Sequence, residues 1–121
     1  MAIKETSRVN EHLEPCLFIA FENGKKVECL IDTGFSGALC LPRHLMEELA
    51  LTKIFEEEIF GIGLHQEVVD VALASIVWLG HKTEIEVLIN NGDDRLLGSE
   101  LLAGKVLNIN YKKGTLSIKD A

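Results

Sequence analysis

Apolar and polar residues alternate in several short runs of the chain, a pattern typical of β-strands with one buried face. The first run covers residues 16–22 and ends at Asn23-Gly24, a dipeptide that favours a tight hairpin turn. A second alternating run covers residues 26–31. The pattern therefore predicts a β-hairpin whose return strand leads directly into Asp32.

A short apolar strand is predicted next, at residues 39–41. Pro42 follows it and suits the first turn of a helix. Leu45, Met46 and Leu49 recur at helical spacing after this proline. We therefore expect a helix to begin at Pro42.

The middle of the chain predicts a pair of longer strands. A strand over residues 54–60 leads to a glycine-bearing hairpin tip at 61–63, and an apolar-rich strand covers 66–79. Gly80 interrupts this pattern, and residues 83–90 return as a strand.

The C-terminal part combines a helical turn with a final hairpin. Residues 96–98 form an apolar-apolar-glycine step, after which Ser99 near an N-cap and Gly104 as a stop predict a short helix. Strands over 106–110 and 115–119 complete the chain. Short strands separated by glycine turns predict an all-β, barrel-like domain with one or two short helices.

Composition is consistent with a single domain. The chain has 121 residues, of which 47% are hydrophobic, enough for a modest core. Residues 1–14 are polar and without clear period, and we expect an N-terminal arm or an edge strand there, with the folded domain over residues 15–121.

The formal charge of -7 argues against nucleic acid as a partner and against a basic membrane-binding surface. The sequence also lacks an apolar run of about eighteen residues, the length that a membrane span needs, and a leader-like start. We therefore expect a cytoplasmic protein that binds neither nucleic acid nor membrane.

The three cysteines, Cys16, Cys29 and Cys40, are an odd number, and we expect buried, reduced thiols in preference to a disulfide. Cys40 and His44 are spaced as zinc ligands can be, as are His12 and Cys16. A second pair at ligand spacing does not accompany either of them, so coincidence is the better interpretation. We expect no metal and no cofactor.

The tripeptide Asp32-Thr33-Gly34 is the strongest candidate for chemistry. An aspartate at the end of a buried strand is costly unless its carboxylate is hydrogen-bonded or shares a proton. The simplest alternative is an ordinary polar turn, because all three residue types are common turn formers.

The order of these features resembles the retropepsin family, the single-domain aspartic proteases of retroviruses and their cellular and bacterial relatives. Four segments carry the resemblance: Leu30–Gly34, the flap-like Phe60–Gly63, Gly80–Lys82 and Leu96–Leu102. Two short stretches that follow the Asp-Thr-Gly triplet, Phe35-Ser36-Gly37 and Leu41-Pro42, look most like those of the bacterial members of clan AA.

The resemblance implies a closed β-barrel that forms a two-fold homodimer, with one Asp-Thr-Gly per chain. Two Asp32 carboxylates that share one proton would activate a water molecule to hydrolyse a peptide bond of a protein or peptide substrate. It assigns Asp32, Thr33 and Gly34 to catalysis, with Thr33 locking the two loops across the dimer axis. It places Gly98 and the apolar pair before it behind the Asp32 loop.

Substrate contacts are expected from seven further residues: Leu30, Phe35, Ser36, Gly61, Ile62, Gly63 and Leu96. Phe35 is a departure, because retroviral enzymes usually have a small residue directly after the triplet. Its ring cannot hydrogen-bond the carboxylate, and part of a substrate pocket is one place for it. Ser36 and Ser99 stand where retroviral enzymes tend to have a paired Asp and Arg, so both charges are missing together.

Three functional interpretations follow. The first is a homodimeric aspartic endopeptidase, which the intact triplet favours, because an idle protein has no chemical need for the carboxylate. The second is a catalytically idle dimer of the same fold that binds a peptide or protein partner, which Phe35 favours. The third is a monomeric β-barrel binding module with a coincidental triplet.

Overall fold

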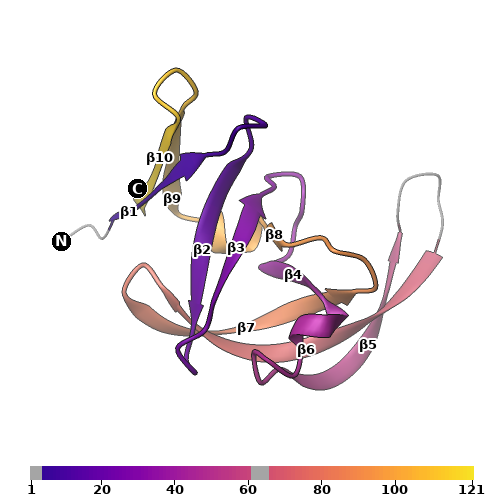
Figure 1. The fold of residues 1–121 in the computed structure, drawn as a ribbon. Helices are drawn as coiled ribbons and strands as arrows, with labels where there is room; N and C mark the ends of the chain where they lie inside the picture. Colours follow the sequence, from indigo (N-terminus) through magenta and orange to yellow (C-terminus); the bar gives the residue numbers. More distant parts are fainter. Residues whose placement is uncertain (1–3, 61–65) are drawn as a thin grey trace.

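The computed structural model describes residues 4–60 and 66–121, and most of these residues lie in β-strands (Figure 1). The all-β prediction is thereby confirmed, with one short helix, α1 (Ser99–Leu102), and one 3₁₀ turn, Arg43–Leu45. The strands are β1 (Lys4–Val9), β2 (Pro15–Phe21), β3 (Lys26–Ile31), β4 (Leu39–Pro42), β5 (Thr52–Phe60), β6 (Gln66–Trp78), β7 (His81–Asn90), β8 (Leu96–Leu97), β9 (Lys105–Asn110) and β10 (Thr115–Asp120).

All of these strands belong to one sheet, in the order β5-β6-β7-β4-β8-β3-β2-β1-β10-β9. A further pairing between β6 and β2 closes six neighbouring strands of the sheet, β6-β7-β4-β8-β3-β2, into a ring. In Figure 1 the long strands β6 and β7 run across the lower end of the β2–β3 hairpin, while β1, β9 and β10 lie to one side. Residues 1–14 were expected to form an arm or an edge strand; β1 pairs with β2 on one side and β10 on the other.

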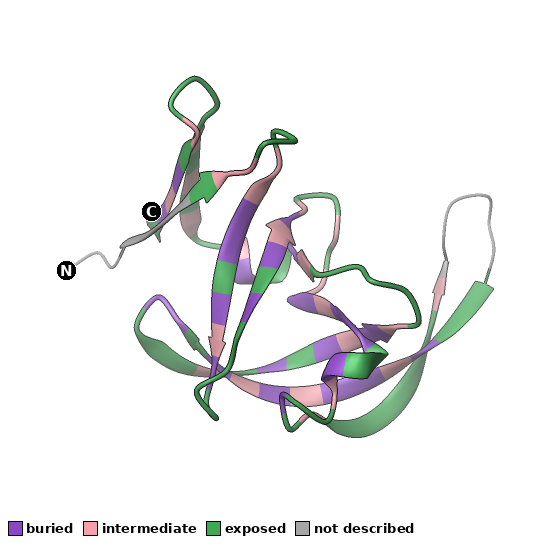
Figure 2. Ribbon diagram, viewed as in Figure 1, coloured by how far each residue is buried: buried purple, intermediate pink, exposed green. Residues whose placement is uncertain are grey.

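The buried core is formed mainly by residues of the six strands of the ring, with contributions from β10 and α1. Ile31, Leu97, Leu39 and Val87 are successive cross-strand neighbours on β3, β8, β4 and β7, and none is more than 6% exposed. Figure 2 shows the same alternation of buried and exposed residues along β2 and β3. Because Ile31 belongs to this row of buried residues, the Asp32 loop that follows it begins directly at the core.

The helix expected from Pro42 is reduced to a single 3₁₀ turn. Pro42 itself stays in β4, paired with Asn90 of β7. Leu45 and Leu49 are buried, so both reach the core from irregular turns. The backbone of Ala50 then has a φ of 54°, a left-handed conformation that turns the chain towards β5 and leaves no length for a helix.

The helix predicted after Gly98 is present but short, and its cap differs from the expectation. Gly98 occupies the N-cap position without a side-chain hydrogen bond, and Ser99 is the first helical residue. Gly104 follows the helix with a φ of 74°, in keeping with its predicted role as a stop. The Trp78 indole N–H donates to the carbonyl of Leu101 at 3.1 Å and fixes α1 to β6.

The three cysteines are free, as expected. Cys16 and Cys29 are buried and Cys40 is half-buried. Burial raises the pKa of the Cys29 thiol to about 12, so this group stays protonated at neutral pH. Within the described ranges there is no cluster of three or more potential metal ligands.

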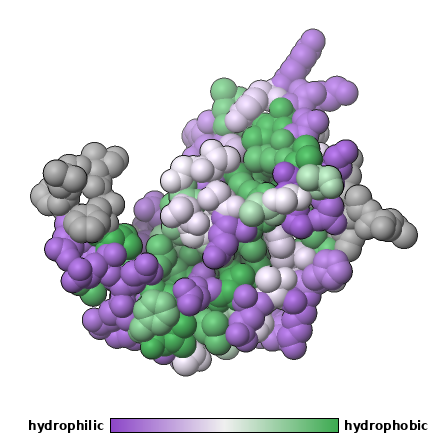
Figure 3. Space-filling view, turned by 180° about the vertical axis from the view of Figure 1, so that it is seen from behind, coloured by the Kyte–Doolittle hydropathy of each residue, from purple (hydrophilic) through white to green (hydrophobic). Residues whose placement is uncertain are grey.

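Apolar side chains also reach the surface, as Figure 3 shows for the face opposite to that of Figure 1. The large ones that are more than 40% exposed are Leu13, Phe18, Ile54, Phe55, Val68, Val77, Val106 and Tyr111. They come from β2, β5, β6, β9 and two turns, and scattered residues of this kind need no partner to explain them. No helix in residues 4–60 and 66–121 has the length and apolar character needed to cross a membrane.

A group of charged side chains fixes the β5–β6 hairpin to the rest of the sheet. Asp70 on β6 contacts Arg43 at 2.8 Å through one carboxylate oxygen and Lys53 on β5 at 3.2 Å through the other. Arg43 also donates from Nε to the side chain of Asn91 at 2.9 Å. The hydrogen bonds from Arg43 and then Lys53 lower the pKa of the Asp70 carboxyl.

We expect Asp70→Asn to lower the free energy of unfolding at pH 7. A carboxyl whose pKa is lowered by folding stabilises the protein above its unfolded pKa, about 3.9 for Asp, and loses that contribution as the pH falls through the folded value. The difference from wild type should therefore narrow below about pH 3.9. Urea unfolding at several pH values measures it, with Glu57→Gln, exposed on the same hairpin, as the control. A difference that stays constant with pH would contradict the ion-pair explanation.

Candidate active site

Asp32 directly follows β3, and backbone hydrogen bonds from Leu30 and from Asp32 itself fix its position. The N–H of Leu30 donates to the carbonyl of Arg95 at 2.8 Å, and the N–H of Asp32 donates to that of Leu97 at 2.9 Å. These bonds belong to the parallel pairing of β3 with β8. The start of the Asp32 loop is therefore attached to a second strand of the sheet.

Asp32 is half-buried as a residue, and its carboxylate is hydrogen-bonded within its own loop. Its Oδ1 accepts a hydrogen bond from the Gly34 N–H at 2.9 Å. A Cβ at Gly34 would lie only 3.3 Å from this oxygen, closer than an ordinary contact. The main-chain carbonyl of Asp32 accepts from the N–H of Phe35 at 3.1 Å, which closes the turn. Glycine at this position thus allows the loop to fold tightly around the carboxylate.

Residues 97–100 lie behind the Asp32 loop and brace it. Gly98 donates its N–H to the carbonyl of Ala38 at 2.9 Å, and Ser99 donates to that of Phe35 at 2.8 Å. A Cβ on Gly98 would overlap the carbonyl oxygen of Gly37 and lie 2.5 Å from that of Phe35. Only glycine allows the two segments to approach this closely.

The residues predicted to bind substrate are distributed as follows. Leu30 and Leu96 are cross-strand neighbours on β3 and β8, and both are half-buried. Ser36 is exposed on the Asp32 loop, as are Thr33 and Gly34. Phe35 is half-buried, with its ring against two glycines of the protein itself. The predicted flap residues Gly61, Ile62 and Gly63 lie outside the described residues.

Sequence reasoning missed the part that Gly37 and Ala38 play in the site. Both contribute a carbonyl oxygen to the bracing of the loop, the first to the N–H of Glu100 at 3.2 Å and the second to that of Gly98. A second glycine shortly after the triplet was the available signal, because it indicates a close backbone approach. The spacing alone did not reveal which segment approaches it.

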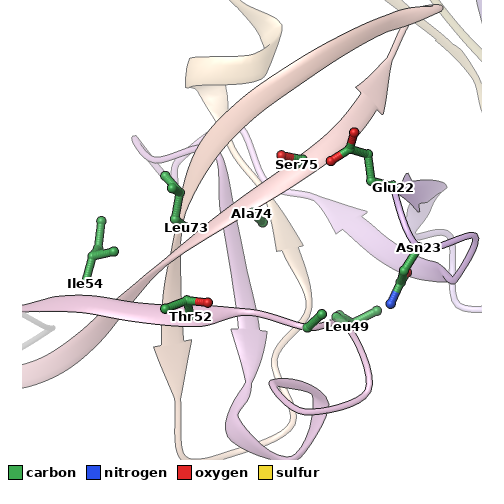
Figure 4. A pocket seen from close by; sticks show the side chains of 9 residues that line it. Glu22, Asn23, Leu49, Thr52, Ile54, Leu73, Ala74 and Ser75 are labelled. Carbon is green, nitrogen blue, oxygen red and sulfur yellow. The ribbon is translucent and has the colours of Figure 1, made fainter.

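A groove between described residues lies elsewhere on the protein. It measures about 580 Å³ and is lined by residues of the β2–β3 turn, the turn before β5, the start of β5 and the middle of β6: Glu22, Asn23, Leu49, Ala50, Thr52, Ile54, Leu73, Ala74 and Ser75 (Figure 4). The Glu22 carboxylate at its polar end already pairs with Lys82 at 2.5 Å. Asp32 and its loop do not line this groove, so the candidate chemistry rests on the loop alone.

One carboxylate can hold or release one proton. Peptide hydrolysis by carboxylates requires both a base for the water and an acid for the leaving amide. A site of that kind would therefore need a second carboxylate beside Asp32.

Comparisons with known proteins agree on the fold. No family model matches the chain, and no curated protein matches it in sequence. Among solved structures, EIAV protease complexed with an inhibitor is similar with a TM-score of 0.61 and 18% identity, over 78% of this chain and 89% of that one. The solution structure of simian foamy virus (mac) protease is similar with a TM-score of 0.56 and 25% identity, over 74% and 92%.

A third similar structure is the foamy viral protease-reverse transcriptase in complex with an RNA/DNA hybrid. Here the TM-score is 0.54 and the identity 22%, over 74% of this chain but only 12% of the larger protein. The fold of this chain is thus similar to that of retroviral proteases, as the resemblance in the sequence implied.

Proposed function

We propose that this protein is an aspartic endopeptidase that acts as a homodimer, with one Asp32 carboxylate from each chain. The observation that carries the proposal is the position of Asp32. It follows a core strand, its carboxylate is held by the Gly34 N–H, and its loop is braced from behind by Gly98. This arrangement occurs in a fold similar to that of retroviral proteases.

The proposed reaction uses the two carboxylates in different protonation states. Like charges held close together share one proton, so one Asp32 is ionised and the other is protonated. The ionised carboxylate takes a proton from water as the water oxygen attacks the scissile carbonyl carbon. The protonated carboxyl donates its proton to the carbonyl oxygen. The first carboxyl then gives the proton that it took from water to the amide nitrogen, the second carboxylate takes back a proton from one of the two hydroxyls on the former carbonyl carbon, and the C–N bond breaks to release an acid and an amine.

Each residue of the loop has a part in this scheme. The Gly34 N–H fixes the plane of the carboxylate, and the exposed Thr33 makes the contact across the dimer axis. Leu30 and Leu96 form a neighbouring apolar surface for substrate side chains, with Ser36 exposed next to it on the loop.

A cleavage assay against a mixed peptide library, with and without pepstatin, tests the proposal. We expect peptide cleavage and its inhibition by pepstatin. Peptide binding without cleavage at any pH would instead support the idle, peptide-binding interpretation. Cleavage that is insensitive to Asp32→Asn would contradict both the aspartic endopeptidase and the idle, peptide-binding interpretation.

Dilution separates a dimeric from a monomeric enzyme. If two chains form the site, the activity per chain should fall as the protein is diluted below the dissociation constant of the dimer. The charge of -7 on each chain opposes association, so added salt should strengthen it. Sedimentation equilibrium at the same concentrations gives the dimer fraction. Activity per chain that does not follow this fraction would contradict the half-site.

A further inference from the structure

The ring of Phe35 lies over two glycines of the candidate site. A Cβ on Gly37 would be 2.6 Å from Cζ of this ring, and a Cβ on Gly98 would be 2.6 Å from its Cδ2. Real Cβ atoms do not approach other carbons so closely, so both glycines leave room for the ring. The ring therefore spans from the Asp32 loop to the segment that braces it.

The backbone of Phe35 connects the same two parts. Its N–H donates to the carbonyl of Asp32 at 3.1 Å, and its carbonyl accepts from the N–H of Ser99 at 2.8 Å. Side chain and backbone thus act at the same junction. Loss of the ring would leave these hydrogen bonds in place but remove the packing that keeps the loop from moving against residues 98–99.

We infer that Phe35 is a positioning residue, whose ring holds the Asp32 loop, and with it the carboxylate, against Gly37 and Gly98. As far as it concerns catalysis, this inference rests on the proposed function. A small residue after the triplet would leave the surface of both glycines uncovered. The phenyl ring fills that space and thereby supports the loop.

A double-mutant cycle tests the contact without any activity. Gly37→Ala places a methyl group against the ring, so it should lower the urea midpoint in wild type and do so much less in a Phe35→Ala background. In Gly98→Ala the methyl group meets the carbonyl oxygens of Gly37 and Phe35 as well as the ring, so most of its cost should persist in the Phe35→Ala background, which retains both oxygens. Equal effects of Gly37→Ala in both backgrounds would overturn the inference.

Amide hydrogen exchange tests the positioning itself. The N–H groups of Gly34 and Phe35 both bond to Asp32, so their exchange reports how often the loop opens. Phe35→Ala should speed exchange of the Gly34 amide by about tenfold, and Phe35→Leu should restore part of the protection. Phe18→Ala, which removes a ring that is 58% exposed on β2, should leave it unchanged. Unchanged exchange in Phe35→Ala would contradict a positioning role.

Kinetics complete the test under conditions in which each variant is folded. Misplacing the carboxylate should lower kcat by about 10- to 100-fold in Phe35→Ala, with KM changed much less. A raised KM at unchanged kcat would instead make Phe35 a substrate contact and overturn the inference. If wild type cleaves nothing, the proposed function fails, while the exchange and the mutant cycle still decide whether Phe35 holds the loop.

Discussion

Asp32→Asn is expected to lower kcat by about 10²- to 10⁴-fold, the usual contribution of a general acid or base. Asparagine has nearly the same shape as aspartate and can still accept the hydrogen bond from the Gly34 N–H. It cannot take a proton from water or return one to the substrate. The loss should therefore appear in kcat, with the urea midpoint close to that of wild type. Asp93→Asn, on the exposed loop after β7, is the matched control.

Mixing the two proteins shows whether one site uses both chains. After wild type and Asp32→Asn exchange subunits at equal concentrations, about one quarter of randomly formed dimers contain two wild-type chains. The activity of the mixture should then be about one quarter of that of a wild-type sample at the same total protein concentration. A value near one half would mean that each chain works alone, and would contradict a shared site.

The sequence predicted those parts of the fold that depend on local patterns. Alternation and the Asn23-Gly24 turn identified β2 and β3, and Gly80 separated β6 from β7. These signals are strong because a strand with one buried face needs apolar residues at every second position. The Asp32 loop could be located for a related reason, since a carboxylate directly after such a strand is unusual.

Features that depend on distant contacts were not predictable in the same way. The apolar spacing after Pro42 is helical, yet Leu45 and Leu49 are buried by turns and not by a regular helix. The left-handed backbone at Ala50 then ends this segment. The charged group around Asp70 joins residues more than fifteen positions apart, without a local signal. The contacts of Phe35 with Gly37 and Gly98 follow from how two segments meet, so residue type alone could not predict them, and its contact with substrate stays a prediction.

Gly98→Ala is expected to be the most destabilising of the single substitutions considered, with a loss of about 3 kcal/mol or more in the free energy of unfolding. The added methyl group meets main-chain oxygens of Gly37 and Phe35, which cannot rotate away as a flexible side chain can. Relief requires the Asp32 loop to separate from α1, which would break the hydrogen bond from Ser99 to Phe35. A small domain has only about 5–15 kcal/mol of stability in total, so the loss is a large fraction of it.

Gly92→Ala distinguishes this clash from a general cost of replacing glycine. A Cβ at Gly92 would meet only the Asn90 side chain, at an ordinary 3.5 Å, so this variant should unfold within about 1 kcal/mol of wild type. Urea unfolding of the two variants beside wild type measures both effects. If Gly98→Ala were as stable as Gly92→Ala, residues 98–99 could not lie as close to the loop as described. The bracing of Asp32, on which the proposed chemistry depends, would then need another source.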